Sequence, residues 1–512
     1  MKPMLSFKES QLLDTYIANN FCISPIELIE SAAANIFHSM IYVIPELRNK
    51  HANILVIAGP GNNGADAVTV AKYLIFSGFY NTTILLHESK NINIEIKTRQ
   101  IKAICANIYT SENFKNTGAW DLIIDGYLGT GMNRPLQNVP QTVKETLFTN
   151  HALIAAIDLP SGIFENEKEP TFITSNPYIP SAQYTFMVSP EKYASYFPGF
   201  RKACGTIFPI EHIFPETIPQ ELPFSDSAIK KIDYNDFSIY KNSISEYCHK
   251  YERGSVAIYG GCKNYSGAVL LAGKTAQAAG AGLVSLRVSE DLFSHLCGTI
   301  SGIIIEPEKL EKPRNVHAIL CGPGWEYNED NRNIFLRLYN NDIPLVADAT
   351  SLKFIDSQFI PQISANKILI CTPHVAEMAQ LLISLSLCTS SEESMLEVLY
   401  NTKNVLLQVA KLLHAIIVLK SSTTWIASPS GTMYVLDGTN SALAVGGSGD
   451  VLAGCIASFL SRNFDEPLSA VTSAVLIHSQ AGKNLAESSG FFDAAQLIDE
   501  IARITYKEIA HG

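Results

Sequence analysis

The chain has 512 residues, 47% of them hydrophobic, and a formal net charge of −11 at pH 7. This length exceeds what a single hydrophobic core accommodates and predicts two or more domains. The negative charge and the lack of a basic run argue against binding to nucleic acid, and apolar stretches such as residues 36–44 are too short to span a membrane.

The N-terminus has no apolar core of the kind a secretory signal carries. The ten cysteines, Cys105 among them, are scattered and form neither a CxxC pair nor a cluster with zinc spacing. We therefore expect a soluble, reduced protein of the cytoplasm.

In the first part of the chain, apolar strands alternate with helical stretches. A helix is expected to begin at Ser24 and Pro25, because serine caps helices, proline suits their first position and Glu27 follows three residues after the cap. Buried strands are expected at residues 53–58, 82–86, 121–124 and 152–157.

The alternation fails between about residues 208 and 251, where four prolines lie close together. We place the domain boundary near residues 215–225, which gives domains at 1–218 and 225–512. A second series of strands is then expected at residues 255–259, 283–288, 317–320, 344–347, 367–371 and 416–420, with a short strand pair ending at Val435. The pattern predicts an α/β protein of two domains, the first a Rossmann-like three-layer sandwich.

Polar residues follow three of the first strands. Residues 59–64 satisfy GxGxxG and Glu88 follows the next strand, which is the pattern of dinucleotide binding. Asp66, expected in the first helical turn, would repel a pyrophosphate, so we favour another ligand. Asn63, Asp125 and Ser161 supply oxygen atoms suited to a simple cation, while residues 129–131 would wrap a phosphate that Arg134 pairs with.

The most informative stretch is residues 443–454. Gly446, Gly447, Ser448 and Gly449 precede an apolar helical run, so free backbone N–H groups at the helix start would bind phosphate. Asp450 lies at the same point, where it is expected to be ionised and able to take a proton from a hydroxyl. A phosphate cradle with an adjacent base is typical of phosphoryl transfer to an alcohol.

Other strand ends in the second part support this interpretation. Ala268 lies in a run of small residues, Gly324 ends a Gly-Pro-Gly loop, and Lys420 with the hydroxyl residues after it suits a nucleotide. His374, followed by Glu377, is either a ligand-binding or a structural histidine. Gly280–Gly282 is expected to end a helix.

Taken in order, these motifs resemble those of the bifunctional NAD(P)H-hydrate repair enzymes. Residues 5–215 resemble the NAD(P)HX epimerase, and residues 250–510 resemble the ADP/ATP-dependent NAD(P)HX dehydratase, which has a ribokinase-like α/β fold. The resemblance implies NADHX, NADPHX and ADP as ligands, potassium in the epimerase domain, Mg²⁺ with ADP in the dehydratase domain, and a homo-oligomer.

The resemblance also implies roles for individual residues. Asp450 and Asp158 would be catalytic, and Asn63, Asp125 and Ser161 would hold potassium. The substrate would contact Asn62, Asn63, Gly64, Ala65, Asp66, Gly129, Thr130, Gly131, Met132, Asn133, Arg134, Pro135, Ala268, Gly324 and His374. ADP would contact Lys420, Ser421, Ser422, Thr423, Thr424, Gly446, Gly447, Ser448 and Gly449.

The chain departs from the family pattern in places. Ala65 and Ala67 replace glycines, which would narrow the ligand's approach, while Thr350 replaces an aspartate and Ser421 a glycine. Three alternatives stay open: a ribokinase-type kinase for a vitamin precursor, an NAD-dependent oxidoreductase, and a regulatory protein that binds ligand without catalysis.

Overall fold

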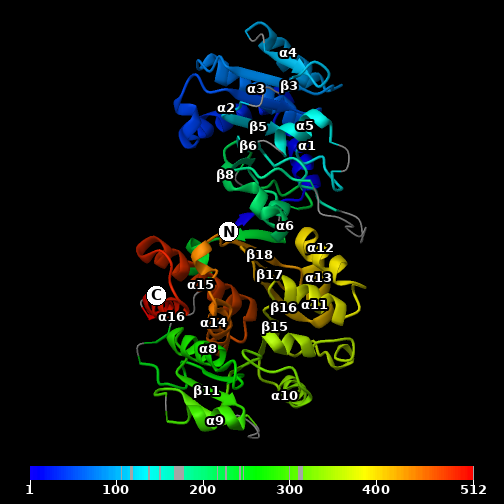
Figure 1. The fold of residues 1–512 in the computed structure, drawn as a ribbon. Coiled ribbons are helices and arrows are strands. Elements are labelled where there is room, and N and C mark those ends of the chain that lie inside the picture. Colours follow the sequence, from blue (N-terminus) through cyan, green and yellow to red (C-terminus); the bar gives the residue numbers. More distant parts are fainter. Residues whose placement is uncertain are drawn as a thin grey trace. The chain divides into compact units, whose positions relative to one another are not determined.

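The computed structural model describes residues 1–104, 107–115, 119–136, 139–148, 152–166, 178–215, 217–224, 228–240, 244–245, 247–298, 300–308 and 315–510. Cys105 and residues 216 and 225 of the expected domain boundary lie outside these ranges. The chain forms two compact units, one of Lys2–Ile229 with Leu399–Asn401 and the other of Met1, Lys230–Val398 and Thr402–Gly512. Both are α/β (Figure 1), as the sequence predicts.

The N-terminal unit contains a seven-stranded sheet in the order β4-β3-β2-β5-β6-β7-β8, and all neighbouring strands are parallel. The strands are β2 (Ile54–Ala58), β3 (Thr82–Leu86), β4 (Ile108–Thr110), β5 (Leu122–Gly126), β6 (Leu153–Ile157), β7 (Tyr184–Val188) and β8 (Thr206–Ile210). The helices are α1 (Phe7–Asn20), α2 (Pro25–Val43), α3 (Asn62–Phe76), α4 (Ile92–Lys102), α5 (Gln141–Leu147) and α6 (Pro198–Arg201).

Alternation along the strands produces the three layers of this unit. Ile54 and Val56 of β2 pack into a core with α2 and α3, whereas Leu55 and Ile57 pack into a second core with α5. The expected start of α2 is confirmed, because the Ser24 hydroxyl accepts a hydrogen bond from the Glu27 N–H at 3.3 Å and the Glu27 carboxylate accepts one from the Ser24 N–H at 2.7 Å.

The sheet of the C-terminal unit runs β9-β18-β17-β16-β15-β14-β13-β10-β11-β12. Its strands are β9 (Ile229–Ile232), β10 (Ser255–Tyr259), β11 (Leu283–Val288), β12 (Ile304–Pro307), β13 (Ala318–Cys321), β14 (Leu345–Ala347), β15 (Leu369–Cys371), β16 (Ala415–Leu419), β17 (Thr423–Ala427) and β18 (Met433–Asp437). The strands from β16 to β12 are parallel, and β16, β17 and β18 pair antiparallel.

Helices cover both faces of this second sheet (Figure 1). One face packs into a core with α8 (Ser266–Ala278), α14 (Ser448–Arg462), α15 (Pro467–Ser489) and α16 (Ala494–Ala510). The remaining helices are α7 (Phe237–Tyr240), α9 (Glu290–Leu296), α10 (Glu329–Tyr339), α11 (Val375–Ser384), α12 (Ser391–Tyr400) and α13 (Thr402–Leu413). Gly280, with φ +103°, follows α8 as the expected helix-ending glycine.

The strand order places a binding site in each unit. In the first sheet β2 lies between β3 and β5, and in the second β10 lies between β11 and β13. The connections run in opposite directions from these central strands, which leaves a crevice at the carboxyl ends of the strands. The polar segments singled out in the sequence follow these strands.

Candidate functional sites

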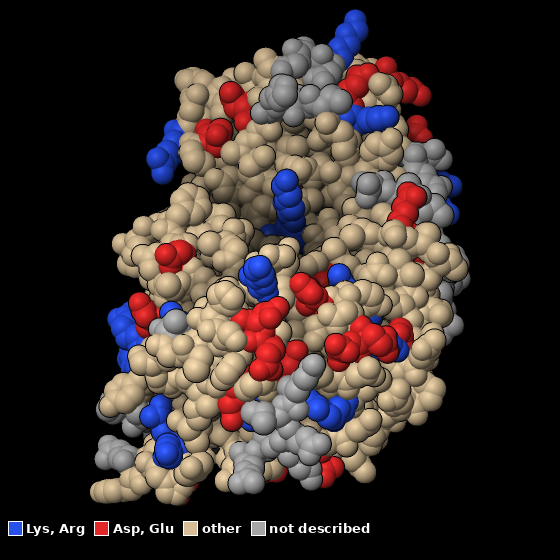
Figure 2. All heavy atoms as spheres, turned by 60° about the horizontal axis from the view of Figure 1, so that its bottom comes forward, with Lys and Arg blue, Asp and Glu red and all other residues tan. Residues whose placement is uncertain are grey.

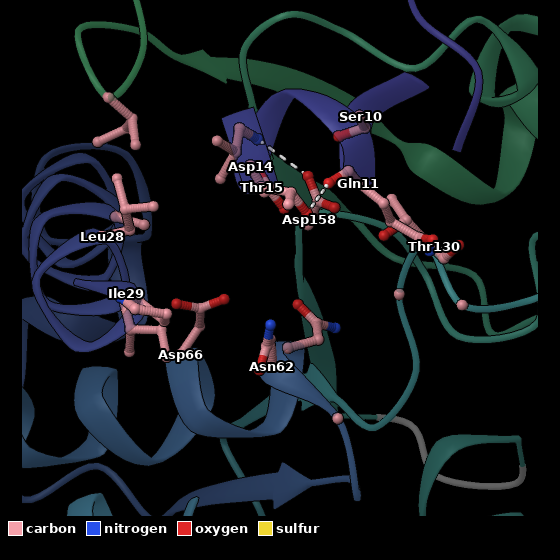
Figure 3. A pocket seen from close by; sticks show the side chains of 18 of the residues that line it. Ser10, Gln11, Asp14, Thr15, Leu28, Ile29, Asn62, Asp66, Thr130 and Asp158 are labelled. Atoms are coloured by element: carbon pink, nitrogen blue, oxygen red, sulfur yellow. Dashed lines mark hydrogen bonds between the residues drawn. The ribbon is translucent and has the colours of Figure 1, made fainter. Parts of the chain in front are cut away.

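The N-terminal unit has a cavity of about 740 Å³ at the carboxyl edge of its sheet. Helix α1, the start of α2, the loop into α3 and the segments after β5 and β6 surround it (Figure 3). The predicted substrate contacts that line it are Asn62, Asn63, Asp66, Gly129, Thr130, Gly131 and Met132, and the predicted catalytic residue Asp158 lines it too.

The other predicted contacts in this unit do not line the cavity. Ala65 is fully buried in a cluster with Ile29 and Ile94, so its methyl group does not narrow the ligand's approach. Ala67 is likewise buried in the core. A Cβ on Gly64 would come within 2.0 Å of the Gly59 carbonyl oxygen, which means that Gly64 serves the packing of α3 on the preceding loop.

The loop after β5 lines the cavity over fewer residues than the sequence predicts. Residues 129–132 line the cavity, but Asn133, Arg134 and Pro135 do not. The Glu165 N–H donates to the Met132 carbonyl at 3.1 Å and holds the loop there. Asn133 and Arg134 are exposed beyond this point, and this structure does not support phosphate pairing by Arg134 within the cavity.

Asp125, Ser161 and Asn63 converge beside the cavity. The Ser161 hydroxyl donates to Asp125 Oδ1 at 2.6 Å, and its own oxygen accepts from the Leu128 N–H at 2.9 Å. The Asn63 side-chain amide donates to the Leu128 carbonyl at 2.9 Å. That contact leaves Asn63 Oδ1 buried without a hydrogen-bond partner.

Asp125 is fully buried, and burial raises the pKa of its carboxyl. Its hydrogen bonds come from the Ser161 hydroxyl and from the N–H groups of Ser161 and Tyr127, all neutral donors. A buried carboxylate with neutral donors and an unsatisfied amide oxygen nearby fits a cation that is bound through oxygen ligands.

Asp158 has a positive φ of 60°, a conformation that few residues other than glycine adopt. Its Oδ1 accepts from the Lys192 ammonium at 2.7 Å and from the Val188 N–H at 3.1 Å (Figure 3). Lys192 is 3% exposed and also donates to the Val188 carbonyl at 2.6 Å. Lys192 lines the cavity, and nothing in its local sequence marked it as part of the site.

Asp66 differs from its sequence-based expectation. Because α3 begins at Asn62, Asp66 lies in the second turn of the helix and not in the first. Burial, with the nearby Asp158 and Asp14, raises the pKa of Asp66 well above its usual range. A raised pKa favours the neutral carboxyl, which weakens the charge repulsion expected between Asp66 and a phosphate.

In the C-terminal unit, the glycine stretch forms the N-terminus of α14. Gly447 is the cap residue with φ +91°, and Ser448 is the first residue of the helix. His478 of α15 contacts the Ser448 carbonyl through Nε2 at 3.1 Å. Burial lowers the pKa of His478 to about 4, so the ring is neutral and donates this hydrogen bond. His478 was not predicted from the sequence.

Asp450 is the third residue of α14 and lies near Lys420, Asp348 and Glu377. Burial and the two other carboxylates raise the pKa of Asp450 to about 6, although Lys420 acts in the opposite direction. The surroundings thus raise the pKa of Asp450 instead of lowering it, but the carboxyl is still ionised at neutral pH. A pKa near 6 suits a general base better, because such a group is ionised at neutral pH and still binds a proton appreciably.

Lys420 follows β16 and connects several strand ends. Its ammonium donates to Asp348 Oδ1 at 2.6 Å and lies 4.0 Å from Glu377 Oε2. Asp348 Oδ1 also accepts from the Thr372 hydroxyl at 2.7 Å. A Cβ on Gly449 would meet only the Lys420 ammonium, at 3.6 Å, which places this lysine beside the first turn of α14.

The predicted substrate contacts of this unit lie at the same edge. A Cβ on Gly324 would come within 3.3 Å of Ala268 Cβ, so these two residues are neighbours. His374 pairs with Lys420 through an isolated β-bridge. His374 Nδ1 accepts a hydrogen bond from the Glu377 N–H at 3.2 Å and thereby caps α11. This is the structural role considered for His374 in the sequence analysis, although its side chain is also exposed.

The segment expected to contact ADP is only partly accessible. Thr423 is fully buried in β17, so its side chain is not available to a nucleotide. The Ser421 hydroxyl donates to the Thr423 carbonyl at 2.5 Å and closes the turn after β16. The Thr350 hydroxyl, at the position of the missing aspartate, donates to the Trp325 carbonyl at 2.9 Å.

The described residues contain no helix long and apolar enough to cross a membrane. Within the same residues, no group of three or more histidine, cysteine, aspartate or glutamate side chains could hold a metal ion. On the face drawn in Figure 2, the coloured lysine and arginine side chains lie apart from one another and form no continuous basic surface.

Two family models match this chain. The first, described as NAD(P)H-hydrate dehydratase, matches residues 256–503, and the second, described as YjeF-related protein N-terminus, matches residues 25–187. Among solved structures, the ADP/ATP-dependent NAD(P)H-hydrate dehydratase of Bacillus subtilis, co-crystallised with ATP and Mg²⁺, is 23% identical. That match covers 54% of this chain and 97% of that one, with a TM-score of 0.47.

Curated relatives extend over most of the chain. The bifunctional NAD(P)H-hydrate repair enzyme Nnr of Thermofilum pendens is 27% identical, over 94% of this chain and 92% of that protein. The Escherichia coli protein of the same name is 25% identical, over 89% of this chain and 85% of that protein. The chain therefore belongs to the bifunctional NAD(P)H-hydrate repair enzyme family, with a YjeF-related N-terminal domain and an NAD(P)H-hydrate dehydratase domain.

Proposed function

We propose that this chain repairs hydrated nicotinamide nucleotides at two sites. The N-terminal domain interconverts the R and S epimers of NADHX and NADPHX, and the C-terminal domain dehydrates the S epimer with ADP as phosphoryl donor. The observation that carries this proposal is the presence of two distinct sites on one chain. One is a cavity lined by the carboxyl groups of Asp14, Asp66 and Asp158, and the other is a glycine-capped helix that carries Asp450 beside Lys420.

Phosphoryl transfer explains how a kinase-like site dehydrates its substrate. Hydrated NAD(P)H carries a hydroxyl on the carbon next to the ring nitrogen, and hydroxide is a poor leaving group. Asp450 takes the hydroxyl proton as the oxygen accepts the phosphoryl group. The lone pair of the ring nitrogen then expels phosphate, and loss of a ring proton restores NAD(P)H.

The first turn of α14 and Lys420 stabilise the charge on the moving phosphoryl group. Among the described residues, the N–H groups of Gly447 and Gly449 have no backbone hydrogen-bond partner and are available at the helix start, whereas the Ser448 N–H donates to the Val445 carbonyl at 3.2 Å. The Lys420 ammonium is fixed by Asp348 at 2.6 Å. Because the described residues contain no cluster of three metal-binding side chains, Mg²⁺ would be held mainly by nucleotide phosphates, with Asp450 or Glu377 nearby, and would offset their charge.

In the N-terminal domain, Asp158 is proposed to be a catalytic residue that contacts the hydrated nicotinamide ring of the bound substrate. Asn63, Asp125 and Ser161 would hold potassium, for which the buried and unpartnered Asn63 Oδ1 is suited. The ion would neutralise Asp125 and thereby fix the turn that contains Ser161, which is close in the chain to Asp158.

The test is recovery of reduced-nicotinamide absorbance from a mixture of R and S epimers. With ADP present, the wild-type protein should convert the whole mixture, and ATP is run in parallel to compare the two donors. A stable phosphorylated product without NAD(P)H would favour the small-molecule kinase, and no conversion under any condition would contradict the proposal.

A further inference from the structure

We propose that Asp14 of helix α1 is a catalytic residue of the N-terminal site and exchanges a proton with the substrate from across the cavity, opposite Asp66. This proposal rests on the epimerase activity proposed above. Asp14 lies outside the loops that carry the family resemblance, and its place follows from how α1 is anchored.

Helix α1 is fixed as a wall of the cavity at several points. The Phe7 N–H donates to the Glu165 carboxylate at 2.6 Å, and Gln11 Nε2 donates to the Thr130 carbonyl at 2.8 Å. Leu13 and Ile17 of the same helix are buried in a hydrophobic cluster, which also holds α1 in place. Asp14 therefore faces the cavity, which it lines together with Gln11.

The carboxyl groups around the cavity have different surroundings (Figure 3). Asp158 is bound to Lys192 and to the Val188 N–H, whereas no hydrogen bond or ion pair is found for the Asp14 carboxyl among the described residues. Asp66 extends from α3 on the opposite side (Figure 3), with Oδ1 buried and without a hydrogen-bond partner. Asp14 and Asp66 are thus the carboxyl groups free to change protonation.

Their surroundings also separate the two groups electrostatically. Burial and Asp158 raise the pKa of Asp14 to about 6, although Lys192 lowers it. Burial, Asp158 and Asp14 raise the pKa of Asp66 much further, against Lys97 and Lys192. The surroundings of Asp66 thus favour its protonated form, whereas Asp14, with a pKa of about 6, is mostly ionised at neutral pH, which is the division between an acid and a base.

Epimer exchange needs this division. Asp66 donates its proton to the ring hydroxyl, the carbon–oxygen bond breaks, and water leaves as the nitrogen lone pair forms a C=N bond. A water molecule then adds to that carbon from the opposite face, and Asp14 accepts the proton it releases. One hydroxyl is lost and one gained, and the proton on Asp14 returns to Asp66 through solvent.

The test measures exchange between purified epimers without ADP, so that dehydration does not contribute. We expect Asp14→Asn to lower the kcat of exchange by about 10²–10⁴-fold and to abolish the acidic limb of the wild-type pH profile near pH 6. Since Asp14 also raises the pKa of Asp66, the alkaline limb should move to lower pH. Asp14→Glu should retain part of the rate and the acidic limb.

Two controls separate chemistry from folding. Leu12→Ala alters an exposed residue of the same helix that does not line the cavity and should keep the wild-type profile. The dehydratase of the Asp14→Asn protein, assayed with ADP, should be unchanged. A kcat within about threefold of wild type, or a raised KM with the acidic limb intact, would overturn the role of Asp14. Absence of exchange in the wild type would instead overturn the epimerase proposal itself.

Discussion

Asp450 lies among three charged side chains, and their balance sets the pH at which it can accept a proton. Lys420 favours the ionised form, whereas burial, Asp348 and Glu377 favour the protonated form and raise the pKa to about 6. A base is active only when ionised, so kcat/KM for dehydration should fall as the pH drops through about 6.

Glu377→Gln tests this balance. The glutamine side chain can still accept the hydrogen bond from the His374 backbone N–H at the start of α11. The substitution removes a negative charge near Asp450. The pKa of Asp450 should fall, and the acidic limb of the dehydratase profile should move to lower pH. Glu27→Gln, the same change in the capping box of α2, should leave the limb in place; an equal shift in both variants would contradict the assignment.

Asn63 tests the cation proposed for the epimerase domain. Asn63→Ala removes the buried, unpartnered Oδ1, so a higher potassium concentration, by about tenfold or more, should be needed for half-maximal epimer exchange. The dehydratase activity of the Asn63→Ala protein is the internal control and should be unchanged. Asn133→Ala, at an exposed position outside the cavity lining, should behave as wild type. Exchange that is indifferent to potassium in the wild type would exclude this use of the site.

These residue properties were only partly accessible from the sequence. Asp450, Asp158 and the oxygen groups of Asn63, Asp125 and Ser161 were predicted, because each follows an apolar strand or precedes a helix. Asp14 and Lys192 were not predicted, since they meet Asp158 only through tertiary structure. The pKa of Asp450 likewise depends on Asp348 and Glu377, which approach from other strand ends.

At the scale of elements, prediction succeeded for most of the central, apolar strands, although β7, which is largely buried between β6 and β8, was missed. The expected strands at residues 82–86, 255–259 and 283–288 coincide with β3, β10 and β11. The strand β8 was missed because it contains Pro209 and lies at the edge of its sheet, where its side chains are largely half-buried or exposed. The strand β12 was missed for a similar reason, as it is short and partly exposed at an edge.

The start of α14 gives a prediction at this scale. Gly447 adopts φ +91°, and an added Cβ would come within 2.5 Å of Leu271 Cδ1. Gly447→Ala should therefore lower the free energy of unfolding by about 1–2 kcal/mol from backbone strain and impair dehydration. Gly446→Ala is the matched control for stability, because a Cβ there meets no atom within 4 Å. An equal loss of unfolding free energy in both variants, measured by thermal denaturation, would contradict this distinction.

At the scale of the whole molecule, the two units divide the work between separate sites. Each has its own sheet and core, and each site is built from residues of one unit only. Fusion on one chain therefore does not make either reaction depend chemically on the other. We therefore expect the epimerase to supply the dehydratase with the usable epimer by way of free substrate.

Mixing two inactivated proteins tests this independence. Asp450→Ala should lower the rate of dehydration by about 10²–10⁴-fold and leave epimer exchange intact. The Asp158→Ala protein should dehydrate the S epimer and then stop, apart from uncatalysed exchange of the R epimer. Combined with ADP and a mixture of epimers, the two should convert all of the substrate, because the R epimer is exchanged on one protein and dehydrated on the other. If the mixture also stops after the S epimer, or if either substitution abolishes both activities, then the sites are not independent.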